Sequence, residues 1–188
     1  MLVPIARAAA IIGVIAAGIL IVVAHRRRPE FVASDVALSV YFTYPTRGLM
    51  TSAYAAIAVA LCSTAAALTT TAYGANLITA AACCIAAVLL IPVVATTQRS
   101  TVTIRREATR RAHRYAAFSA FLTIGIAMVA STYNAINEFD APLAVLGFLG
   151  ITLVVSVLKG KSAPLHGLKQ RLLLAILGLW VVTIALTG

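Results

Sequence analysis

Residues 8–29, with the sequence AAAIIGVIAAGILIVVAHRRRP, join an uncharged apolar run directly to three consecutive arginines. A helix needs about 20 apolar residues to cross the hydrocarbon core of a bilayer, and the apolar segment over 3–24 reaches that length. A cleaved signal peptide carries its basic residues before the apolar run, not after it. The order of residues therefore predicts a retained membrane-spanning helix that ends at the basic cluster beginning with His25.

The rest of the chain repeats this pattern. Of the 188 residues, 62% are hydrophobic and only 11% are charged, whereas a soluble domain carries about 25% charged residues. These apolar runs lack the alternating polar residues of a membrane β-barrel. The sequence predicts an all-α, polytopic membrane bundle that forms a single domain over 1–188. Its six spanning helices are expected near 3–24, 50–72, 77–97, 114–134, 142–158 and 168–187.

The positive charge is confined to alternate connections between these helices. All Lys and Arg except Arg7, which is 14 of the 15, follow the first, third or fifth apolar segment. Short connections rich in Lys and Arg stay in the cytoplasm. The pattern predicts an inner cell membrane protein with its basic connections in the cytoplasm and both termini outside.

This basic face is the candidate binding surface. Each basic residue close to anionic headgroups contributes about 1 kcal/mol of attraction. The expected partners are anionic membrane lipids or an acidic surface of another membrane protein subunit, and no nucleic acid is expected. Alternatively, the charges serve only to set the topology. The candidate lipid- or partner-binding residues are Arg26, Arg27, Arg28, Arg105, Arg106, Arg110, Arg111, His113, Arg114, His166, Lys169 and Arg171.

The three histidines, His25, His113 and His166, all fall on the basic face. A membrane metallohydrolase would gather His and acidic ligands at one interface, and two histidines could ligate a haem. The HExxH spacing of zinc hydrolases is absent. No catalytic residue, metal site or cofactor is therefore predicted, and a metal- or haem-binding protein remains an alternative.

The first basic connection contains a short apolar and aromatic stretch. Ser34 and Asp35 are suited to cap a helix over 36–42, which is too short to span the bilayer. We expect it in the membrane interface or between helices, with Tyr41, Phe42 and Tyr44 at headgroup depth. Together with His113 and His166 it would line a shallow cavity at the bilayer surface.

Three stretches carry a family resemblance: ALSVY…TRGLMT over 37–51, AHRYAAF over 112–118, and GLKQRL over 167–172 followed by Trp180. They resemble the bacterial "domain of unknown function 998" membrane family. The resemblance covers most of the chain and implies six helices in this order. It also implies that His113, Gln170, Arg171 and Trp180 are the family-type residues, and places the chain in a wider group with the DRAM and FGF-receptor-activating proteins.

The chain departs from the family pattern in two ways. The acidic turn after the third helix is replaced by Ile91-Pro92-Val93-Val94. Family members also place basic residues in the second and fourth connections. Either this chain inserts inverted, or its basic connections face outward against an acidic partner, and the charge favours the inverted insertion. The family has no agreed activity, and the resemblance implies a fold more than a function.

Three functions are compatible with these features. The leading prediction is a non-enzymatic accessory subunit of a larger membrane complex, whose basic face binds anionic lipid or an acidic partner. The first alternative is a lipid-handling membrane enzyme or transporter that uses His113, His166 and Arg171 at the interface. The second alternative is the haem- or metal-binding protein.

Overall fold

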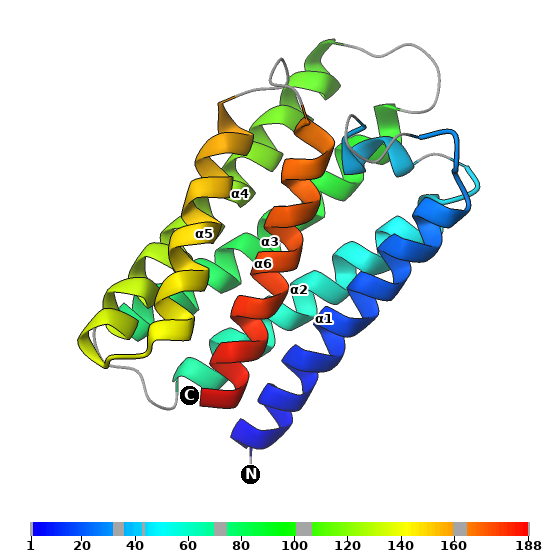
Figure 1. Ribbon diagram of the computed structural model, residues 1–188. Helices are drawn as coiled ribbons and strands as arrows, with labels where there is room; N and C mark the ends of the chain where they lie inside the picture. Colours follow the sequence, from blue (N-terminus) through cyan, green and yellow to red (C-terminus); the bar gives the residue numbers. More distant parts are fainter. Residues whose placement is uncertain are drawn as a thin grey trace.

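A computed structural model describes residues 2–31, 36–42, 44–69, 75–100, 107–159 and 165–187. These residues form six α-helices and a short 3-10 helix, η1 (Figure 1). The elements in chain order are α1 (Leu2–Arg26), η1 (Leu38–Tyr41), α2 (Arg47–Thr69), α3 (Ala75–Ser100), α4 (Glu107–Asn137), α5 (Ala141–Leu158) and α6 (His166–Thr187).

The predicted all-helical membrane fold is confirmed. By length and composition all six α-helices are able to cross a bilayer, and no strand occurs among the described residues. The largest difference from the sequence prediction is in α4, which begins at Glu107 instead of at 114. Hydropathy finds only the apolar part of a helix, so it missed the basic turns with which α4 starts.

Each helix packs against the next one in the chain, and α6 returns to pack against α1 and α2. Small residues allow the closest approaches. A Cβ added to Gly13 of α1 would lie 2.8 Å from the carbonyl oxygen of Ala56 in α2. Between α4 and α5, a Cβ on Gly147 would collide with the side chain of Thr132. Backbone contact between helices therefore replaces large interlocking side chains.

Side-chain hydrogen bonds join helices inside the bundle. The indole Nε1 of Trp180, which is fully buried, donates to Ser131 Oγ at 2.8 Å and so joins α6 to α4. Asn134 Nδ2 donates to Asn76 Oδ1 at 2.7 Å and joins α4 to α3. Because lipid offers no hydrogen-bond partners, such bonds stabilise the correct register of neighbouring helices.

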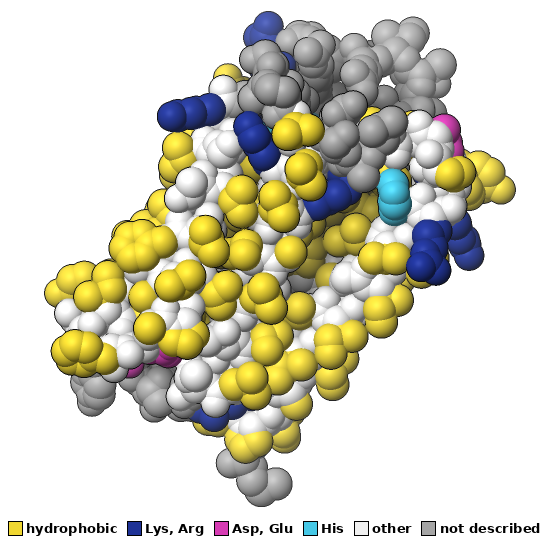
Figure 2. All heavy atoms as spheres, in the orientation of Figure 1, with side chains coloured by type: hydrophobic (Ala, Val, Ile, Leu, Met, Phe, Trp, Pro, Cys, Tyr) yellow, Lys and Arg dark blue, Asp and Glu magenta, His cyan; other side chains and the backbone are white. Residues whose placement is uncertain are grey.

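The two ends of the bundle differ in charge. Both termini lie at one end, and the helix ends that flank the first, third and fifth connections lie at the other (Figure 1). In Figure 2 the Lys and Arg side chains on the visible face gather mostly at this second end, and hydrophobic side chains cover the body between the ends. We call the second end the basic end.

Candidate functional site

A groove of about 680 Å³ lies between α1 and α6, with α2 behind it. Its walls are apolar and are formed by residues such as Gly18 and Ile21 of α1, Ile57 of α2, and Leu174 and Gly178 of α6. Figure 2 shows it as a hollow lined by hydrophobic side chains, with basic side chains and a histidine at its upper end. We call it the α1–α6 groove.

The depth of the groove matches one leaflet of a bilayer. At 1.5 Å per residue, the distance along α1 from Val14 to His25, both of which line the groove, is about 16 Å. This is about half of the 30 Å hydrocarbon core. Near the lower limit α1 and α6 touch, because a Cβ on Gly178 would lie 3.0 Å from Val14 Cγ1. The length of the groove therefore equals about that of one leaflet, and the groove lies in the half of the bundle towards the basic end.

Charged and polar groups are concentrated at the upper limit of the groove. His25 and Arg26 from the last turn of α1 and Arg171 from the second turn of α6 line it there. His25 and Arg171 are only partly exposed, whereas Arg26 is exposed. The site thus combines an apolar groove with a cationic end. This arrangement is complementary to the apolar tail and negative head of an anionic lipid.

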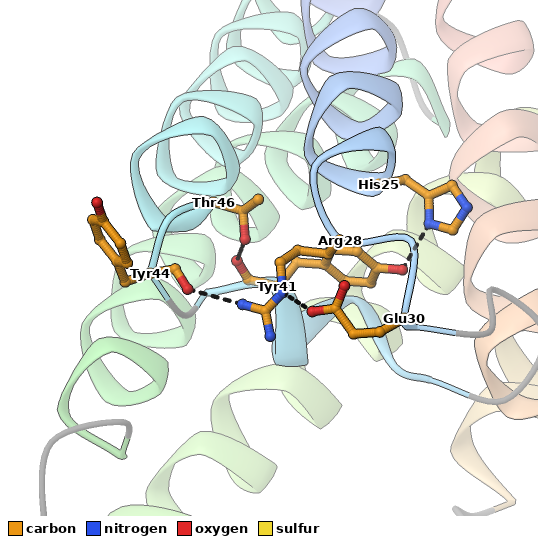
Figure 3. A network of polar contacts seen from close by, with 6 residues as sticks. All are labelled: His25, Arg28, Glu30, Tyr41, Tyr44 and Thr46. Atoms are coloured by element: carbon orange, nitrogen blue, oxygen red, sulfur yellow. Dashed lines mark hydrogen bonds and ion pairs between the residues drawn. The ribbon is translucent and has the colours of Figure 1, made fainter.

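Tyr41 of η1 connects two of these groups, and Figure 3 shows its contact with His25. Its hydroxyl lies 2.8 Å from His25 Nδ1, and Arg171 Nη2 donates to the same hydroxyl at 3.3 Å. Tyr41 is 1% exposed, and the edge of its ring packs against Phe31 with centroids 5.2 Å apart. This buried tyrosine therefore holds a residue of α1 and a residue of α6 in fixed positions.

η1 is attached to the start of α6. The backbone N–H of Leu38 donates to Gln170 Oε1 at 3.0 Å, and Gln170 Nε2 lies 3.1 Å from His166 Nε2. Arg171 Nη1 donates to the carbonyls of Val36 and Gly167, each at 3.0 Å. Two adjacent polar residues of α6 thus satisfy the N–H of Leu38, the first residue of η1, and the carbonyl of Val36 just before it, which would otherwise lack partners away from water.

Arg28 stabilises the outer side of the connection between α1 and α2, which contains η1. Its guanidinium forms an ion pair with Glu30, donates to the carbonyl of Tyr44 at 2.8 Å, and lies 4.3 Å from the centre of the Phe31 ring. Hydrogen bonds from the backbone and from Arg28 lower the pKa of Glu30 below its usual value. Thr46 Oγ1 donates to the carbonyl of Tyr41 at 2.7 Å (Figure 3).

The structure corrects the predicted helix over 36–42. The helical segment is the shorter 3-10 helix Leu38–Tyr41, and its N-cap residue is Ala37, which makes no side-chain capping bond. The predicted caps, Ser34 and Asp35, lie outside the described residues. Tyr41 and Phe42 are buried in the protein instead of facing headgroups, because they pack in one cluster with Ala24 of α1 and Met50 of α2. Tyr44 is 91% exposed.

The predicted cavity at the bilayer surface also differs from the groove found. Among the described residues, His25 and Arg171 line the groove and His113 and His166 do not. His113 Nδ1 lies instead 3.3 Å from Thr96 Oγ1, between α4 and α3. His25 was absent from the predicted binding residues, although its position directly after an apolar segment and before Arg26 could have indicated it.

The other predicted binding residues are distributed around the basic end. Of the whole candidate set, Arg26 and Arg171 line the groove. Arg27, Arg28, Arg111, Arg114 and Lys169 are described and lie outside it, whereas Arg105, Arg106 and the side chain of Arg110 lie outside the described part. Within the described ranges, no group of three or more His, Cys, Asp or Glu is placed to hold a metal ion.

Comparison with known proteins gives one match. A family model described as "Protein of unknown function (DUF998)" matches residues 11–187. No curated protein and no solved structure matches the chain. Two of the three stretches that carry the resemblance, residues 37–51 and 167–172, meet in the structure through Leu38, Tyr41, Gln170 and Arg171.

Proposed function

We propose that this chain, which belongs to the DUF998 family of proteins of unknown function, is a membrane protein that binds one acyl chain of an anionic lipid in the α1–α6 groove. The observation that carries the proposal is the polarity of the groove. Its apolar part is one leaflet deep and ends at His25, Arg26 and Arg171, so a lipid fits it without leaving its own leaflet.

The headgroup end determines which lipid binds. Moving an acyl chain from the bilayer into an apolar groove yields little hydrophobic gain, because lipid tails are as apolar as leucine side chains. Attraction between the lipid head and the two arginines does discriminate, since each basic residue at the surface contributes about 1 kcal/mol towards an anionic headgroup. The groove therefore sets the shape of the ligand, and the cations set its charge.

The distribution of charge also supports an orientation. In the sequence, 14 of the 15 Lys and Arg follow the first, third or fifth apolar segment, and the exception is Arg7. The positive-inside rule therefore favours the basic end in the cytoplasm and both termini outside. The groove would then sample the cytoplasmic leaflet of the inner cell membrane, where anionic lipids attract basic proteins.

The accessory-subunit function stays a prediction. Large apolar side chains are exposed along the outer surface, for example Ile12 and Ile19 on α1 and Ile85 and Val88 on α3. Lipid tails cover such a surface as well as a partner helix does. The groove favours lipid binding more specifically, and purification in mild detergent would reveal a protein subunit if one remains bound.

Gly18 allows a sharp test. It lines the groove, and a Cβ added to it meets no atom within 4 Å. Gly18→Leu should therefore obstruct the groove for an acyl chain without disturbing the helices. Gly48→Leu is the matched control, because Gly48 is helical and equally open but lies outside the groove.

Lipid retained by each purified variant would be measured by native mass spectrometry. We expect wild type and Gly48→Leu to retain an anionic lipid and Gly18→Leu to lose it. Equal retention by all three proteins would rule out the groove as the binding site.

A further inference from the structure

The hydrogen bonds that join Arg171, Tyr41 and His25 at the cationic end of the groove run in one direction, from Arg171 to His25. The guanidinium of Arg171 has only donors, so the Tyr41 hydroxyl oxygen accepts from it at 3.3 Å. The hydroxyl proton of Tyr41 then needs an acceptor, because Tyr41 is 1% exposed and a buried donor without a partner is costly. His25 Nδ1, at 2.8 Å, is that acceptor.

This direction determines the proton position on His25. A neutral imidazole has one donor nitrogen and one acceptor nitrogen. If Nδ1 accepts from Tyr41, the ring proton is on Nε2, which lies on the side of the ring away from the hydroxyl (Figure 3). His25 lines the groove beside Arg26 and Arg171. The charged and polar side chains among the described residues that line this end are therefore an N–H of His25 and the guanidinium groups of Arg26 and Arg171, and all three are hydrogen-bond donors.

We infer that Tyr41 is a positioning residue that holds His25 as a hydrogen-bond donor beside Arg26 and Arg171, so that the described side chains at this end of the groove select a lipid whose head is an anionic oxyacid without an ammonium group. This inference rests on the proposed function and specifies its ligand class. A carboxylate offers only acceptors and negative charge, and a phosphate monoester, with a charge of about −1.5 to −2 at pH 7, offers mainly acceptors. A zwitterionic head brings a cation close to Arg26 and Arg171, where like charges repel.

Selectivity would be measured by spin-label competition in phosphatidylcholine vesicles. The probes are spin-labelled stearic acid, which carries a carboxylate, spin-labelled phosphatidic acid, which carries a phosphate, and spin-labelled phosphatidylcholine as the zwitterionic reference. The signal that Gly18→Leu abolishes is taken as groove binding. We expect wild type to prefer at least one oxyacid probe, and the preferred probe identifies whether the head is a carboxylate or a phosphate.

Tyr41→Phe removes the hydroxyl and keeps the ring that packs on Phe31. We expect groove binding to persist and the oxyacid preference to fall about fivefold, the equivalent of one lost hydrogen bond. His25→Gln is the conservative variant, since its amide nitrogen donates from a position similar to Nε2. It should retain the preference that Tyr41→Phe loses.

The proton position has a readout that does not depend on lipid. Nitrogen NMR of histidine-labelled protein should show His25 protonated on Nε2 in wild type and a mixture of tautomers in Tyr41→Phe, with His25→Gln providing the assignment. A wild-type proton on Nδ1, or unchanged selectivity in Tyr41→Phe, would overturn the inference and leave the groove intact as a lipid site. If wild type and Gly18→Leu instead gave the same spin-label signal with every probe, the proposed function itself would be overturned.

Discussion

The side-chain oxygen of Gln170 accepts a hydrogen bond from the backbone N–H of Leu38 at 3.0 Å, across 132 positions of sequence. This bond fixes the start of η1 against the first turns of α6. Tyr41 follows within the same short helix, so the position of its hydroxyl between His25 and Arg171 depends on this attachment.

Gln170→Ala should loosen η1 without unfolding the bundle. The lost hydrogen bond is equivalent to about 1 kcal/mol, and the Leu38 amide should exchange its hydrogen correspondingly faster. Hydrogen exchange followed by mass spectrometry of the 36–42 segment measures this. Lys169→Ala, one residue earlier on the same helix, is the control and should leave the exchange unchanged.

Arg26→Gln should weaken anionic lipid binding by about fivefold, because one basic group near the headgroups contributes about 1 kcal/mol. Arg27→Gln is the matched control, since Arg27 is also exposed but does not line the groove. Retained lipid per protein, from native mass spectrometry, measures the effect. Equal losses in the two variants would mean that charge acts through the whole basic end and not at the groove.

Trp180→Phe should destabilise the bundle because it removes the hydrogen bond from Trp180 Nε1 to Ser131 Oγ at 2.8 Å. Hydrogen bonds between membrane helices contribute about 0.6 kcal/mol on average and up to about 1.7. A double-mutant cycle with Ser131→Ala, read by unfolding in mixed detergent micelles, isolates the bond from the change in packing. Additive effects of the two substitutions would show that this bond contributes no coupling.

Gly147→Ala should destabilise the contact between α4 and α5 more than Gly150→Ala does. The new Cβ at 147 meets the β-branched side chain of Thr132, whereas at 150 it meets the flexible end of Met128. Overpacking of this kind costs about 1–3 kcal/mol. Thermal unfolding in detergent measures both variants, and Gly18→Ala, at an open position, should not lower the melting temperature.

Cysteines introduced at Tyr44 and Phe139 should report the orientation. Both residues are almost fully exposed, at 91% and 93%, and they flank opposite ends of the bundle. In intact cells a membrane-impermeant thiol reagent should modify Phe139→Cys but not Tyr44→Cys. The reverse pattern would place the basic end outside, which is the orientation implied by the family resemblance. Cys62, Cys83 and Cys84 would be replaced first.

The sequence predicts the helices well because hydropathy and charge are local properties. The end of α1 follows from residues 8–29 alone, and the structure ends that helix at Arg26. η1 could not be predicted with its correct bounds, because the side chains that bind the backbone of Leu38 and Val36, Gln170 and Arg171, come from the far end of the chain. A local capping argument therefore placed its start at the wrong residues.

The groove was equally inaccessible to sequence reasoning. It exists because α1 and α6 touch near Val14 and Gly178 and leave a space between them towards His25 and Arg171. The alanine, valine and glycine residues of α1 and α6 are compatible with close packing along the whole length of the two helices. The sequence indicated the basic end as the site, and only the relation between the two helices shows which of its cations border an apolar space.

The α1–α6 groove, which closes where Val14 meets Gly178, determines how lipid binding should be quantified. Because the α1–α6 groove lies beside the lipid tails over the depth of one leaflet, a lipid reaches it by lateral diffusion and never crosses water. Occupancy then depends on the mole fraction of that lipid in the leaflet, and adding more membrane of the same composition leaves it unchanged. A titration should therefore vary bilayer composition at constant total lipid, and the result is an exchange constant between two lipids.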